Sequence, residues 1–322
     1  MPAPRALCAL VGALWLAAGR APAPAAQAEP TAELAIGEVA DHSAVVWARC
    51  APPSALHVHL DGREGDLGRA VETASDGTAH IALAALSPAS GYRVRAWCGA
   101  DDGSARVATF RTAPAPEVAA PLRFAFGGDV GGQNVCRDAQ RGYPIFTHIA
   151  ARRPDFFIGL GDMIYADDAC LPLGRYGNAQ IPGPPPATDL SGFRAHWRYN
   201  RADPAFADLL AQVPLIAVWD DHEIINDAGP RQAAAATAPG VDLLPPALRA
   251  FLEYQPLRPP ADDPTRLYRR LRWGRHAELF LLDTRQYRSA NSAPDGAGKT
   301  MLGTAQLAWL ADALQTSDAT WK

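Results

Sequence analysis

The sequence lacks a long hydrophobic run beyond its first residues, and it lacks an excess of basic charge. A membrane-spanning helix needs about 20 consecutive apolar residues, so the later part of the chain offers no candidate span. The 322 residues include 30 Lys and Arg against 34 Asp and Glu, a formal net charge of −4. A mildly acidic chain is poorly suited to non-specific nucleic-acid binding. We therefore expect no membrane span and no requirement for a nucleic-acid partner, in a chain long enough for roughly two domains.

The apolar run that does occur lies at residues 6–18, directly after Arg5, and is too short to cross a bilayer. Small residues follow it and end in an Ala-x-Ala pattern at Ala28, the layout of a secretory signal peptide. Cleavage there removes residues 1–28 with Arg5 and Arg20, so 28 basic residues remain against 34 acidic ones and the net charge becomes −6. We expect an exported protein, either periplasmic or secreted.

Cysteine is scarce. The chain has five, and Cys8 leaves with the signal peptide, so four remain. An even number of cysteines in an oxidising compartment predicts disulfide bonds. Cys50 and Cys98 lie in one region and Cys136 and Cys170 in the next, and we pair them accordingly. Four cysteines allow three connectivities, and a thiolate that binds a metal is the alternative.

Residues 31–113 have the texture of an all-β domain. Short alternating segments are separated by Pro, Gly, Asp and Ser, and they lie at 44–50, 56–60, 79–84, 92–98 and 105–110. This pattern is typical of an immunoglobulin-like or fibronectin III-like sandwich. The turn at 86–88 that leads to Tyr92 resembles the tyrosine corner of such modules. We interpret the region as an accessory domain, followed by a linker at 114–121.

Residues 122–322 read as an α/β domain. Predicted strands at 122–126, 156–160, 214–219 and 277–282 alternate with predicted helices at 143–153, 193–212 and 304–316. In such domains ligands gather where the strands end. Two segments rich in Pro, Gly and Ala, 171–190 and 229–246, are predicted to be loops over that edge.

Each of the first three strands of this domain ends in an acidic motif. The motifs are Gly-Gly-Asp ending at Asp129, Gly-Asp at Asp162, and the run Asp220-Asp221-His222-Glu223. Any one of them could be an ordinary turn. Three together at one sheet edge predict a polynuclear metal site, because hard cations take oxygen ligands and a bridging carboxylate can hold two ions.

These motifs resemble those of the calcineurin-like metallophosphoesterases, and more closely the PhoD-like alkaline phosphatases. The resemblance rests on Gly161-Asp162-Met163-Ile164-Tyr165, on Trp219 to Glu223 with Asn226-Asp227, on Leu282 to Tyr287, and on Met301-Leu302-Gly303. It covers nearly all of the mature chain. It implies a metallophosphoesterase-type layered sheet domain preceded by the all-β sandwich.

The resemblance also implies roles for individual residues. Metal ligands would be Asp129, where many members have cysteine, Asp162 as a bridge between two ions, Tyr165 as a tyrosinate, and Asp221; His222 would face the phosphate as the catalytic group, with Asn226 and Arg285 as substrate contacts. The cofactors would be two or more metal ions, Fe(III) with Ca, or alternatively Zn or Mn. The substrate would be a small phosphomonoester or phosphodiester, hydrolysed by a metal-activated hydroxide.

Several alternatives stay open. Tyr165 could be a core aromatic, Asp167 and Asp168 could be solvated loop carboxylates, and Arg285 could form a structural ion pair; Asp220 and Glu223 are read as supports of the site. The family continues past the segment that ends at Lys322, so we expect a C-terminally truncated chain with an incompletely assembled site. The competing functional hypothesis is a secreted binding module without catalysis.

Overall fold

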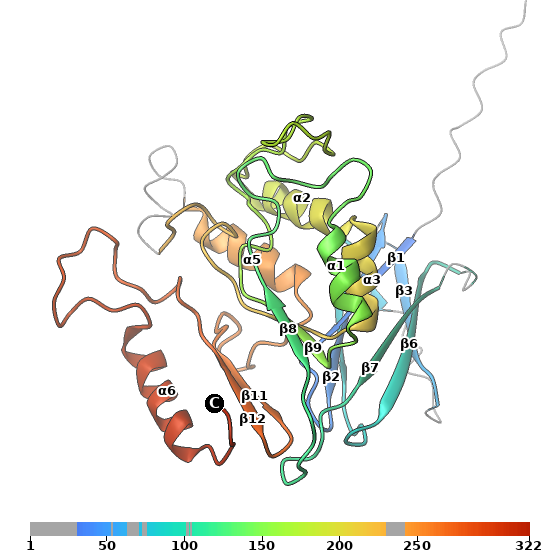
Figure 1. The fold of residues 1–322 in the computed structure, drawn as a ribbon, viewed down its shortest axis with the longest axis vertical. Helices are drawn as coiled ribbons and strands as arrows, with labels where there is room; N and C mark the ends of the chain where they lie inside the picture. The colour runs from blue at the N-terminus through green and yellow to red at the C-terminus, as the bar shows by residue number, and fades with distance from the viewer. Residues whose placement is uncertain are drawn as a thin grey trace, which may run out of the picture.

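The computed structural model describes residues 31–52, 54–62, 71–72, 76–100, 103, 105–229 and 242–322. The predicted signal peptide at 1–28 lies outside these residues. A mixed α/β architecture is organised around one central sheet (Figure 1). No helix in the described ranges is both long and apolar enough to span a membrane.

The central sheet has six strands in the order β5-β2-β1-β10-β9-β8. They are β1 (Thr31–Gly37), β2 (Ala44–Ala51), β5 (Thr78–Leu83), β8 (Phe124–Gly127), β9 (Phe156–Gly159) and β10 (Leu215–Ala217). Strands β8, β9 and β10 are parallel, whereas β1, β2 and β5 pair antiparallel. The two halves join where β1 runs parallel to β10 at Gly37 and Leu215.

A second antiparallel sheet, in the order β4-β3-β6-β7, faces the N-terminal half of the central sheet. Its strands are β3 (Ala55–Leu60), β4 (Val71–Glu72), β6 (Gly91–Cys98) and β7 (Arg106–Arg111). Buried side chains from both sheets share one hydrophobic core, and the Cys50–Cys98 disulfide links β2 to β6 as predicted. The tyrosine-corner contact is also present, since the Ser87 N–H donates to the Tyr92 hydroxyl at 2.7 Å.

The predicted strands of residues 31–113 are therefore present, but a separate sandwich domain is not confirmed. Strands β1, β2 and β5 belong to the same sheet as the three parallel strands. Phe156 and Ile216, from β9 and β10, also pack into the core of the N-terminal sheets. Residues 114–121, predicted to be a linker, form no helix or strand.

Five helices are described: α1 (Pro144–Ala151), α2 (Leu190–Arg201), α3 (Pro204–Gln212), α5 (Leu244–Tyr254) and α6 (Gly303–Thr316). The prediction of a single helix at 193–212 is wrong, because the helical segment is interrupted at Asp203. Pro204 has no N–H to continue the ladder, and the Asp203 carboxylate caps α3 by accepting the N–H of Phe206. Helix α5 was not predicted, and its first residues lie in the segment 229–246 that was predicted to be a loop.

Strands β11 (Arg269–Trp273) and β12 (Ala277–Leu281) form a separate two-stranded sheet. The sheet covers β9, where Phe156 meets Trp273 with ring centroids 5.1 Å apart. Helix α6 lies on its outer side, away from α1 and α3 (Figure 1). At the edge strand β8, Phe124 and Phe126 are 47% and 65% exposed.

Candidate metal centre

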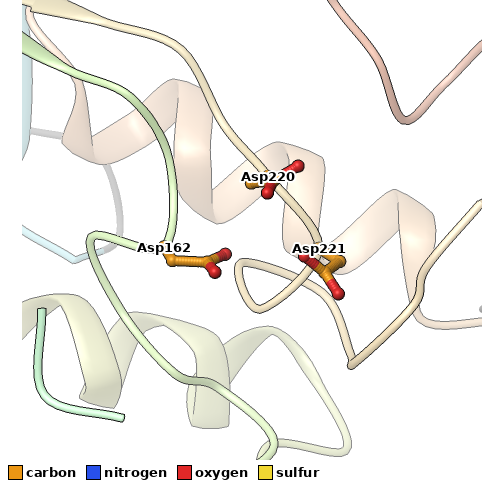
Figure 2. Close-up of side chains that lie close together, drawn as sticks. All are labelled: Asp162, Asp220 and Asp221. Carbon is orange, nitrogen blue, oxygen red and sulfur yellow. The ribbon is translucent and has the colours of Figure 1, made fainter. Parts of the chain in front are cut away.

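Three carboxylates meet at the ends of two neighbouring parallel strands. Asp162 follows β9, and Asp220 and Asp221 follow β10. Each offers one oxygen, and these oxygens all lie within 4.8 Å of one another. In Figure 2 the Asp162 side chain points toward the segment that carries the other two. The three residues are called the carboxylate cluster below.

The local backbone is shaped to bring these carboxylates together. Gly161 has φ of +96°, and a Cβ there would lie 2.5 Å from the Asp220 nitrogen, so a larger residue would push the two loops apart. Glu223, 1% exposed, accepts the N–H groups of Asp162 at 2.9 Å, Met163 at 2.7 Å and Asp220 at 2.8 Å. One buried carboxylate therefore ties the end of β9 to the end of β10, as expected of a supporting residue.

The three carboxylates repel one another electrostatically. Burial raises the pKa of Asp162 to about 6; the N–H of His222 opposes this shift, and the charges of Asp221 and Asp220 add to it. Burial also raises the pKa of Asp220, against its ion pair with Arg285. Like charges this close favour a bound cation, because a cation stabilises all of the ionised forms at once.

Arg285 is the cation that the chain itself supplies. Its Nε lies 2.6 Å from Asp220 Oδ1, and its Nη2 lies 3.1 Å from Asp221 Oδ1. The backbone N–H of Arg285 donates to Asp283, which is fully buried. The geometry matches the structural ion-pair alternative, with Asp220 and Asp221 as the partners, while the predicted substrate contact stays a prediction.

His222 is oriented by a residue whose role the sequence did not reveal. Its Nδ1 lies 2.7 Å from Asp167 Oδ1, and its ring stacks on Tyr165 with centroids 4.1 Å apart. Burial lowers the pKa of His222. The hydrogen bond to Asp167 and the negative charges of the nearby aspartates together outweigh this effect and raise the pKa to about 9. Asp167 also accepts the N–H of Asn226 at 2.8 Å. The prediction of a solvated Asp167 is therefore wrong: the side chain is 17% exposed and fixes the imidazole.

Asp129 and Tyr165 form a pair beside the carboxylate cluster. The Tyr165 hydroxyl donates to Asp129 Oδ1 at 3.0 Å. Burial raises the pKa of Tyr165, and the charge of Asp162 raises it further, so the phenol stays protonated beside these acids unless a cation is bound. Asn226 is exposed, and its side chain donates to Asp227 at 3.1 Å.

A disulfide fixes the loop that borders the strand ends carrying the carboxylate cluster. Cys136 and Cys170 are bonded as predicted, so neither thiol of this pair is free to bind a metal. The segment from Leu171 onward has no helix or strand until α2 begins at Leu190, as predicted. The Ala187 N–H donates to the Ala166 carbonyl at 2.7 Å, which holds this loop against the motif that carries Asp162.

The model of the PhoD-like phosphatases matches residues 124–322. The chain belongs to the PhoD-like phosphatase family. It is 27% identical over 325 residues to alkaline phosphatase D of Bacillus subtilis (strain 168), covering 90% of this chain and 54% of that protein. A solved structure of PhoD superposes with a TM-score of 0.72 at 26% identity, covering 90% of this chain and 60% of that one. The chain thus spans about half the length of the curated relative, 54%.

The side chains that are present fit the metals expected in this family. The carboxylate cluster offers only oxygen donors, which suit hard cations such as Ca, Mn and Fe(III). Asp220, predicted to be a support, belongs to the cluster, whereas Asp129 is not one of its three residues and accepts the Tyr165 hydroxyl beside it. Adjacent acids at a strand end were the only sequence signal for Asp220, and they could not tell which of the two points inward.

Proposed function

We propose that this chain is an exported, metal-dependent phosphatase that hydrolyses phosphate monoesters, diesters or both. The observation that carries the proposal is the carboxylate cluster of Asp162, Asp220 and Asp221 at the strand ends of a PhoD-like phosphatase. Because the chain spans 54% of its curated relative, the activity of the whole protein is part of the proposal. The family match does not favour the alternative of a non-catalytic binding module.

Two or more metal ions would be held by the carboxylate cluster, with Asp129 and Tyr165 beside it as further ligands. We propose Fe(III) with Ca, or else Zn or Mn. When bound, such ions neutralise charge on phosphoryl oxygens and activate water. Their positive charge would also favour ionised Asp162, and it would lower the cost of an ionised Tyr165.

His222 would handle the proton on the leaving oxygen. Its Nδ1 is bonded to Asp167, so Nε2 is the ring nitrogen left to donate to substrate. The stacked Tyr165 ring and the Asp167 carboxylate together limit rotation of the imidazole. Asn226, whose backbone N–H donates to Asp167, would contact the phosphate from its exposed position.

The test is hydrolysis of an aryl phosphomonoester and an aryl phosphodiester by the purified chain loaded with Fe(III) and Ca, Zn or Mn. Asp162→Ala should abolish release of the aryl alcohol. A matched control is Asp262→Ala, which removes a carboxylate that is 76% exposed and pairs with Arg266 at 3.7 Å. Equal rates for the Asp162 variant and the wild type, or no activity with any of these metals, would refute the proposal.

Export is proposed on the sequence of residues 1–28 and on the two disulfides, which suit an oxidising compartment. Fusion of residues 1–28 to a reporter enzyme that is active only outside the cytoplasm would test it. Retention of the fusion in the cytoplasm would contradict it.

A further inference from the structure

Arg285 is held in the middle of the acidic edge by several independent contacts. Its guanidinium donates to Asp220 Oδ1 at 2.6 Å, to Asp221 Oδ1 at 3.1 Å and to the Ala228 carbonyl at 3.1 Å. The side chain is 12% exposed. A bound phosphate would have to compete with two carboxylates for this group, so the contacts point to a task other than binding substrate.

The backbone that carries Arg285 is also fixed. Asp283, 0% exposed, accepts the N–H groups of Arg285 and Gln286, each at 3.0 Å. The same carboxylate accepts the Trp219 indole N–H at 3.0 Å, directly before Asp220 in the chain. The segments that carry the guanidinium and its acidic partners are therefore anchored to a common buried group.

We propose that Arg285 is a positioning residue that holds the carboxylate cluster together in the metal-free chain and sets its affinity for metal. The inference rests on the proposed metal site. The three ionised carboxylates carry a charge of −3, and the guanidinium, paired with Asp220 and Asp221, reduces it to −2. Arg285 thus offsets repulsion before the ion arrives and competes with the ion once it is there.

Two opposite effects follow from removing this charge. Without Arg285, the metal-free chain keeps the repulsion between Asp220 and Asp221, so its thermal stability falls. The bound cation loses a repelling neighbour, so its affinity rises by about tenfold or more. A residue with a merely structural role would lower both the stability and the affinity.

The experiment is calorimetric titration of the chelator-treated chain with Ca²⁺ and with Mn²⁺, paired with thermal unfolding in chelator. Arg285→Gln should bind both ions about tenfold more tightly than wild type and should melt at a lower temperature in chelator. Arg285→Lys keeps the charge, so its affinity should stay within about threefold of wild type. The matched control is Arg288→Gln, whose guanidinium contacts Asn291 at 2.7 Å and should leave the affinity unchanged.

Unchanged or weaker binding by Arg285→Gln would overturn the inference. If that variant does not fold, Arg285→Lys decides: a change in affinity of about tenfold despite the retained charge would also overturn it. Wild-type chain that binds neither ion would overturn the proposed metal site together with this inference. Tight binding by wild type with no gain in Arg285→Gln would overturn the inference alone.

Discussion

Glu223→Ala is the sharpest test of how the site is built. Glu223 is 1% exposed and accepts three backbone N–H groups, from Asp162, Met163 and Asp220. Alanine leaves these donors without an acceptor, and each unsatisfied buried donor costs about 1–3 kcal/mol. Allowing for relaxation and entry of water, we expect the free energy of unfolding to fall by about 4 kcal/mol.

Glu223→Gln is the matched control for this change. The single side-chain oxygen of glutamine can take the place of Oε2, which accepts the N–H groups of Asp162 and Asp220. The glutamine NH₂ group then faces the Met163 N–H, so that one hydrogen bond is lost. The expected cost is about 2 kcal/mol. Urea unfolding of both variants in chelator at constant pH measures the two costs. A Glu223→Ala variant within about 1 kcal/mol of wild type would refute the claim that Glu223 ties the strand ends together.

Three further predictions concern other parts of the molecule. Asp167→Asn should lower the turnover of an aryl phosphate by about tenfold or more with little change in KM, because it loosens the His222 imidazole; an unchanged rate would contradict this. Burial lowers the pKa of His80, so the folded chain resists the proton that the unfolded chain takes up below about pH 6.5. The contribution of neutral His80 to stability should therefore be complete above that pH and fall toward pH 5, and His80→Gln should flatten this part of the pH dependence in thermal scans. The double change Cys136→Ser with Cys170→Ser opens a loop with a sequence separation of 34 and should cost about 3–4 kcal/mol in urea unfolding, whereas a cost near zero would contradict the chain-entropy estimate.

The sequence predicted the strands that build the site better than it predicted how the sheets join. Strands β8, β9 and β10 were expected because each is a short apolar run that ends in acids. Strand β1 was missed, because it is buried nearly throughout and shows no clear alternation, and its pairing with β10 merges the two regions. The Asp203-Pro204 pair is a sequence signal for a new helix start. It was overlooked because the apolar periodicity on both sides of the pair suggested one continuous helix.

The candidate site divides in the same way. Asp162, Asp221 and His222 could be named from motif and strand position, and the structure brings them together. The role of Asp167 could not be predicted, because it depends on a contact with His222, which lies 55 residues further along the chain, and no local sequence pattern indicates that contact. The partners of Arg285 were equally out of reach, since three-dimensional packing alone decides whether a guanidinium meets a phosphate or an aspartate.

The most direct test of the central claim is the metal content of the purified chain after dialysis against Mn²⁺, measured by elemental analysis. The carboxylate cluster predicts that wild type and Asp262→Asn retain the ion and that Asp162→Asn loses most of it. Retention of as much metal by Asp162→Asn as by wild type would contradict the assignment of this cluster as the metal centre.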